Sequence, residues 1–201
     1  MARMPAPGDT SPRMQNFETL LAAAQAGAAW ACTEVWIEYS PAVAAFLRAR
    51  GSREPDDVTS EVFIAVFEQL PKFVGGPAEL RSFVFSIAYR RLVDELRMRS
   101  RRGEHAEFTA GIDPRHTESA EQAALTRLGD ASALGLLDTL PAEQRDVMVL
   151  RIVADLTVEQ IAEIVGKRPG AVKALQRRAL ENLRKRISPT RTPTGASDDS
   201  E

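Results

Sequence analysis

The stretch Leu156-Thr157-Val158-Glu159-Gln160-Ile161-Ala162-Glu163-Ile164-Val165-Gly166, followed by Lys167-Arg168-Pro169-Gly170-Ala171-Val172-Lys173, predicts two helices joined by a short turn. Thr157 is a good N-cap, and Gln160, three residues later, can complete a capping box. Gly166 can take the left-handed conformation that ends a helix, and Pro169 suits the first position of the next helix. A short helix, a glycine turn and a basic second helix together form a helix-turn-helix.

The second of these helices, expected over residues 169–187, has one apolar side and one basic side. Its apolar side should pack inward, and consists of Val172, Leu175, Ala179 and Leu183. Side chains that can bond base edges in the major groove, or phosphates beside it, are Arg168, Lys173, Gln176, Arg177 and Arg178. The alternative interpretation is a solvated, arginine-rich final helix. The cap, the glycine turn and the one-sided charge occur together, which favours a DNA-reading helix over that alternative.

The rest of the chain also has helical periodicity, so the sequence predicts an all-α protein of two small helical domains joined by a flexible linker. We expect a disordered arm over residues 1–14, a first domain over 15–102, an acidic linker over 103–130, a second domain over 131–187 and a disordered tail over 188–201. Within the first domain, Ser40-Pro41 suggests a break, with Pro41 opening a new helix.

Charge is segregated along the chain, although the formal net charge is only −2. One basic block lies between Arg81 and Arg102, and a second lies between Lys167 and Arg186. Acidic residues collect elsewhere, over residues 54–68, over 104–130 and in the tail. Two basic blocks separated by acidic segments indicate two contacts with a polyanion.

Several classes of function have no support in the sequence. Cys32 is the only cysteine, and His105 and His116 are the only histidines, so we expect no disulfide, no metal site and no cofactor. No serine–histidine pair or glycine-rich phosphate loop suggests an enzyme. No apolar run could span a bilayer, and the N-terminus lacks the apolar core of a secretory signal. We therefore expect a cytoplasmic protein without membrane insertion.

Three segments together resemble a known family. Leu140-Pro141-Ala142-Glu143-Gln144-Arg145-Asp146-Val147-Met148-Val149-Leu150-Arg151, which leads into the helix-turn-helix, is similar to the C-terminal domain of extracytoplasmic-function RNA polymerase sigma factors. Asp56-Asp57-Val58-Thr59-Ser60-Glu61-Val62-Phe63 resembles the acidic helix of their N-terminal domain, and the stretch from Ser82 to Arg97 resembles their promoter-melting helix. The resemblance covers about residues 18–187.

The resemblance implies a role for each segment. The acidic helix would dock on the clamp helices of the largest subunit of core RNA polymerase, through Asp56, Asp57, Ser60, Glu61 and Ile64. The loop 72–77 and the helix after it would capture the melted −10 promoter strand, through Lys72, Phe73, Tyr89, Arg90, Arg91 and Arg97. The helix-turn-helix would read the −35 element as duplex. Further partners implied are the flap of the second-largest subunit and an anti-sigma factor.

The sequence leaves open the base preferences, the environment of Tyr89 and two alternative functions. Ser60, Phe83, Arg90 and the pair Leu175-Gln176 depart from the family's usual residues, so the base preferences are not fixed. Phe83 and Phe85 are expected in the core, whereas Tyr89 could face either the core or DNA. A stand-alone helix-turn-helix regulator is the alternative function, and an adaptor that binds polymerase without DNA is a third. The basic first domain argues against both.

Overall fold

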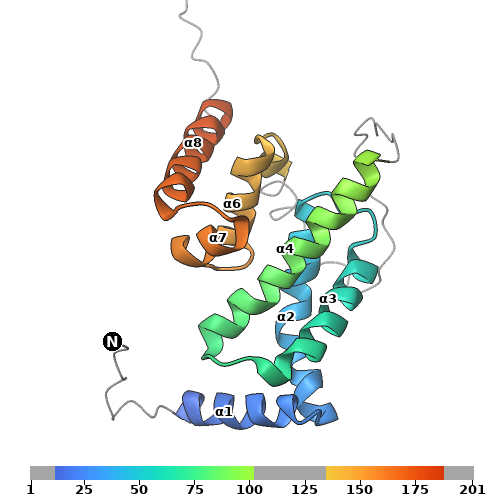
Figure 1. The fold of residues 1–201 in the computed structure, drawn as a ribbon. Coiled ribbons are helices and arrows are strands. Elements are labelled where there is room, and N and C mark those ends of the chain that lie inside the picture. The colour runs from blue at the N-terminus through green and yellow to red at the C-terminus, as the bar shows by residue number, and fades with distance from the viewer. Residues whose placement is uncertain (1–11, 102–134, 188–201) are drawn as a thin grey trace, which may run out of the picture.

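The structure, a computed structural model, describes residues 12–101 and 135–187, and its described elements are all helical (Figure 1). The all-α prediction is confirmed for these residues. The expected linker and tail, and most of the expected arm, lie outside them. Among the described helices, none is both long enough and apolar enough to cross a membrane.

The N-terminal domain contains four helices and one short 3-10 turn. They are α1 (Pro12–Gln25), α2 (Ala29–Ala49), α3 (Pro55–Gln69), the turn η1 (Leu70–Lys72) and α4 (Pro77–Arg101). Helices α2, α3 and α4 pack side by side, and α1 crosses their lower end in Figure 1. Fully buried phenylalanines at positions 46, 63 and 85 fill the space between them.

Helix α2 corrects one expectation from the sequence, because it runs through Pro41 without a break. A proline inside a helix has no N–H to donate to the carbonyl four residues earlier. Here that carbonyl belongs to Ile37, whose side chain is 60% exposed, and Pro41 is exposed as well. The lost hydrogen bond is therefore on the solvent side of α2, and the buried face of the helix keeps its packing.

The C-terminal domain consists of α6 (Ala142–Ile152), α7 (Val158–Val165) and α8 (Pro169–Ile187) in the part described. Both α6 and α7 pack against α8. Helices α7 and α8 have the bounds that the sequence pattern predicted. Val149, Leu150, Leu156, Ile161 and Val172 are fully buried among these helices.

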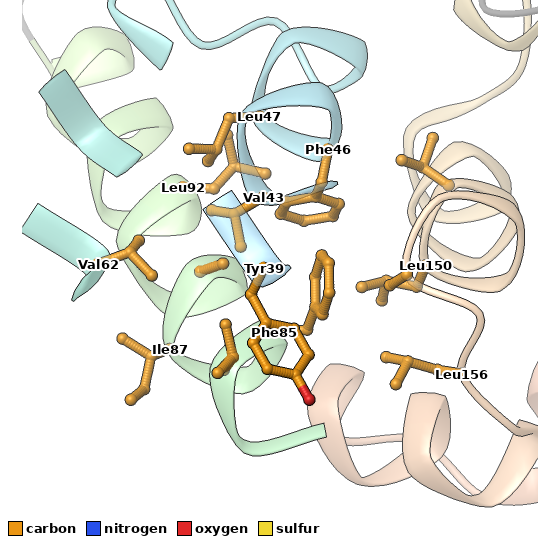
Figure 2. Close-up of a cluster of buried hydrophobic side chains, with 14 of the residues drawn as sticks. Tyr39, Val43, Phe46, Leu47, Val62, Phe85, Ile87, Leu92, Leu150 and Leu156 are labelled. Atoms are coloured by element: carbon orange, nitrogen blue, oxygen red, sulfur yellow. The ribbon is translucent and has the colours of Figure 1, made fainter. Parts of the chain in front are cut away.

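The two domains are packed against each other. Helix α7 contacts α4, and α6 contacts α2. One cluster of buried side chains includes residues of both domains. Figure 2 shows Leu150 and Leu156 of the C-terminal domain across from Phe46 and Phe85 of the N-terminal domain. The N-terminal domain therefore shares its apolar core with the helix-turn-helix.

Candidate nucleic-acid interface

The helix-turn-helix has the caps that the sequence predicted. The Thr157 hydroxyl accepts a hydrogen bond from the Gln160 backbone N–H (3.2 Å), and the Gln160 side-chain oxygen accepts one from the Thr157 N–H (2.9 Å). Gly166 takes the left-handed conformation, with φ +67°. The N–H of Lys167 then donates to the carbonyl of Ala162 (2.9 Å), which closes the helix end. These bonds fix the direction in which α8 leaves the turn.

Helix α8 carries its cations on the solvent side. Val172 and Ala179 are fully buried. The exposed cations predicted to read DNA are Arg168, Lys173, Arg177 and Arg178, and Gln176 beside them is half-buried. Arg177 lies 3.8 Å from the Glu181 carboxylate, an exposed pair one turn along the helix. Four of the five predicted side chains thus lie in the N-terminal half of α8, and Arg168 lies in the turn directly before it.

A second basic surface lies on α4 and the loop before it. Lys72 is exposed in η1, and Arg90, Arg91 and Arg97 are exposed along α4. The Arg90 guanidinium donates to the carbonyl (3.1 Å) and hydroxyl (3.2 Å) of Ser86 on the same helix. These four cations can follow a phosphate backbone along α4.

Phe73 and Val74 occupy different environments in the loop between η1 and α4. Phe73 is half-buried, and its ring lies 5.2 Å from the ring of Phe83. Val74, which the sequence analysis did not select, is 93% exposed. The side chain that this loop presents to solvent is therefore Val74. Phe85 is buried as expected, whereas Phe83 is half-buried against Phe73.

Tyr89 faces the other domain. Its hydroxyl donates to Oδ2 of Asp146 on α6 (3.4 Å). Burial and the Asp146 carboxylate raise the pKa of Tyr89 to about 12, although the Arg50 guanidinium opposes the shift. In this arrangement Tyr89 belongs to the contact between the domains.

Asp146 also forms an ion pair with Arg50, at the C-terminal end of α2. The two side chains are only 14% and 7% exposed. Burial raises the pKa of Asp146 above its ordinary value, although the positive charge of Arg50 and the hydrogen bond from Tyr89 act in the opposite direction. Neither Arg50 nor its pairing with Asp146 was suggested by any pattern in the sequence.

The predicted acidic face of α3 is exposed. Asp56, Asp57, Ser60 and Glu61 all face solvent, and Ile64 is 60% exposed on the same helix. Asp56 pairs with Arg48 (2.8 Å), and the Ser60 hydroxyl donates to the Asp56 carbonyl (3.1 Å). An apolar side chain among carboxylates on one helix face is suited to bind a basic partner protein.

The described residues contain no group of three or more histidine, cysteine, aspartate or glutamate side chains that could hold a metal ion. The candidate site consists of the three surfaces described above. They are the basic face of α8, the loop 70–76 with the cations of α4, and the acidic face of α3.

Comparison with protein families gives two matches. Residues 36–102 match the model described as Sigma-70 region 2, and residues 136–185 match Sigma-70, region 4. The first match covers most of α2, α3 and α4, and the second covers α6, α7 and α8.

Several curated proteins are similar over most of the chain. ECF RNA polymerase sigma factor SigD of Mycobacterium tuberculosis is 32% identical over 195 residues, covering 89% of each chain. ECF RNA polymerase sigma factor ShbA of Streptomyces griseus is 31% identical over 168 residues, covering 79% of this chain and 88% of its own. A solved structure of CnrH, in complex with the cytosolic domain of CnrY, has the same fold with a TM-score of 0.61 at 21% identity, covering 85% of this chain and 96% of that one.

Proposed function

Because the chain belongs to the family of extracytoplasmic-function (ECF) RNA polymerase sigma factors, we propose that its three surfaces divide the work of promoter recognition. The basic face of α8 reads the −35 element, the loop 70–76 with α4 captures the −10 strand, and the acidic face of α3 binds core RNA polymerase. The observation that carries the proposal is the helix-turn-helix with its exposed cations, in a chain whose other domain carries a second basic surface.

Reading of the −35 element is assigned to Arg168, Lys173, Gln176, Arg177 and Arg178. Arginine bonds guanine and glutamine bonds adenine at the base edges of the major groove, and any of the cations can bind phosphate. The exposed positions of Arg168 in the turn and of the three cations on α8 support this assignment.

Capture of the −10 strand is assigned to the loop and α4. The exposed cations Lys72, Arg90, Arg91 and Arg97 suit the phosphates of a single strand. Val74 offers an apolar contact for an unstacked base, with Phe73 behind it. Tyr89 can take part only after its bond to Asp146 is released.

The proposed function requires the two domains to separate. The −35 and −10 elements are named for their positions, which differ by about 25 base pairs. This separation corresponds to about 85 Å of duplex. In the structure, the two domains are instead in contact. The Gln160 side chain of α7 donates to the carbonyl of Ala78 (3.1 Å) at the start of α4, directly after the loop 70–76. The 33 residues between Arg101 and Gly135 can reach at most about 120 Å, enough for separated domains to bind both elements.

Binding to core polymerase is assigned to Asp56, Asp57, Ser60, Glu61 and Ile64, with the clamp helices of the largest subunit as the partner. The C-terminal domain is assigned to the flap of the second-largest subunit. Phosphodiester chemistry belongs to the polymerase, so the chain itself acts without catalytic residues. An anti-sigma factor is a further proposed partner, since a similar solved structure is that of the sigma factor RpoE from Bartonella quintana in complex with the anti-sigma factor NepR.

The experiment that tests the proposal is reconstitution with bacterial core RNA polymerase, followed by selection of promoters from a randomised duplex library. Reversal of Asp57 and Glu61 to lysine should weaken core binding by more than about tenfold, because the surface would then repel a basic partner. A matched control reverses Glu34 and Glu38, two exposed carboxylates with the same spacing on α2 and outside the three surfaces, and should leave core binding unchanged.

Each outcome has a distinct meaning. Core binding that the α3 reversals abolish, with selection of two conserved elements, supports the proposal. If the folded chain binds selected duplex DNA but not core polymerase, the assignment of α3 is wrong and the chain acts as a stand-alone helix-turn-helix regulator.

A further inference from the structure

The side chain of Gln25 connects α1 to the loop 70–76 by hydrogen bonds. We propose that Gln25, the last residue of α1, is a positioning residue for −10 strand capture, acting through the backbone of the loop 70–76. This inference rests on the proposed role of that loop. Gln25 precedes residues 36–102, the part of the chain that matches Sigma-70 region 2.

The Gln25 amide makes two hydrogen bonds with the loop. Its Nε2 donates to the carbonyl of Leu70 (3.1 Å) and to the carbonyl of Phe73 (2.7 Å). A side-chain amide nitrogen has two N–H donors, so both bonds form at once. The Phe73 N–H donates to the same Leu70 carbonyl (3.0 Å), which makes the turn around Lys72 a closed unit attached to α1.

The other end of the loop is fixed by Glu79. The Glu79 carboxylate accepts a hydrogen bond from the N–H of Gly76 (2.9 Å). Its side chain also packs against Gly75 so closely that an added Cβ there would lie 2.7 Å from Glu79 Cβ. The loop is therefore held on both sides of Val74, the side chain that stands out at 93% exposure.

These hydrogen bonds allow Gln25 to influence strand binding through the conformation of the loop 70–76. A loop held in its binding conformation loses less conformational entropy when it binds a strand than a mobile loop does. Without the amide, the Phe73 carbonyl loses the one partner described for it, and the turn loses its attachment to α1. Lys72 and Val74 would then sample many positions relative to the cations on α4.

The test compares Gln25→Ala and Gln25→Glu with wild-type protein in reconstituted holoenzyme. Gln25→Glu keeps the shape but replaces the donor with an acceptor that faces two carbonyls. Gln69→Ala is the matched control, since that amide donates to Ala65 of its own helix (3.0 Å) and leaves the loop carbonyls untouched. The readouts are binding of a single-stranded −10 oligonucleotide and of a −35 duplex, both taken from the selected promoter. Amide hydrogen exchange of residues 70–76 is measured in the DNA-free protein.

Both Gln25 variants should exchange faster in residues 70–76 and bind the −10 strand about tenfold more weakly. Core binding and −35 duplex binding should stay at the wild-type level, as should all properties of Gln69→Ala. Unchanged exchange in the loop, unchanged strand binding, or a parallel loss of core and −35 binding would overturn the positioning role. The wild-type holoenzyme itself could fail to bind the −10 strand while the Gln25 variants still show faster exchange in residues 70–76. In that case the proposed function of the loop is wrong, and the contact from Gln25 to the loop stands.

Discussion

Arg50 and Asp146, 96 positions apart in the sequence, form a buried ion pair that joins the end of α2 to α6. Tyr89 of α4 donates its hydroxyl to the same carboxylate. Three helices from two domains thus meet at one carboxyl group. Near this group the contact also has an apolar part, with Phe46 and Phe85 on one side and Leu150 on the other (Figure 2).

Removing the Asp146 charge should open the domains. Asp146→Asn leaves the Arg50 guanidinium buried without its counter-ion, a penalty of about 3–5 kcal/mol that separation of the domains relieves by returning Arg50 to water. Small-angle X-ray scattering should then show a larger radius of gyration than for wild-type protein. Asp56→Asn, which breaks the exposed pair with Arg48, should leave the radius unchanged. Equal radii for Asp146→Asn and wild-type protein would contradict a closing role for the ion pair.

Tyr89 should resist ionisation in alkaline solution. In a Tyr39→Phe background Tyr89 is the remaining tyrosine, and absorbance at about 295 nm reports tyrosinate directly. With a pKa of about 12, Tyr89 should be about one-tenth ionised at a pH of about 11, where a free tyrosine is about nine-tenths ionised. Adding Asp146→Asn should lower the pKa of Tyr89, because a nearby negative charge is lost. Full ionisation of Tyr89 near the ordinary pKa of tyrosine would show that it is not in the contact.

The raised pKa of Tyr89 also predicts how domain closure depends on pH. The pKa of Tyr89 is raised, so its contribution is present below the ordinary tyrosine pKa of 10.0 and is lost as pH rises towards about 12. Closure should therefore weaken as pH rises through this window, and small-angle scattering across it measures the change.

The two glycines of the helix-turn-helix should respond in opposite directions to alanine. Gly166 has φ +67°, a conformation that an alanine adopts at a penalty of about 1–2 kcal/mol. Gly170 lies inside α8, and an added Cβ there meets nothing within 4 Å, so alanine should stabilise by about 0.4–1 kcal/mol. Free energies of unfolding from urea titrations test the pair. A Gly166→Ala protein as stable as wild type would mean that the turn adopts another conformation.

Adjacent cations in the turn should differ in their effect on DNA binding. Arg168 is exposed, whereas Lys167 is bound to Glu143 of α6 (2.8 Å). Arg168→Ala should reduce the salt dependence of −35 duplex binding by about one unit of slope, and Lys167→Ala should change it by much less. Fluorescence anisotropy of the holoenzyme over a range of salt concentrations measures both slopes. Equal slopes for Arg168→Ala and wild-type protein would exclude Arg168 from the phosphate contacts.

The local features of the fold could be predicted because their causes are local. Thr157, Gln160, Gly166 and Pro169 fix the ends of α7 and the start of α8 through bonds to near neighbours, and all four acted as expected. The break predicted at Pro41 was wrong, because an exposed proline removes one hydrogen bond on the solvent side of α2 and leaves its buried face packed. That environment depends on which face of α2 the rest of the domain covers.

The contacts that join distant segments could not be predicted from one sequence. Gln25 and the loop it holds are more than 40 positions apart, and neither end carries a distinctive motif. Val74 was overlooked because its exposure depends on Phe73 packing against Phe83. The resemblance suggested Tyr89 as a DNA contact, but its present partner is decided by how the two domains meet.

The close packing of α4 against α7 has a consequence for affinity. Because one chain joins the two domains, each meets the other at an effective concentration on the order of millimolar. Promoter DNA that spans both domains, as the proposed function requires, must compete with this internal ligand. The measured dissociation constant of the free protein is then the intrinsic one divided by the fraction of molecules that are open. A partner that binds only the open form raises that fraction to one, and so strengthens every other contact of the chain without touching it.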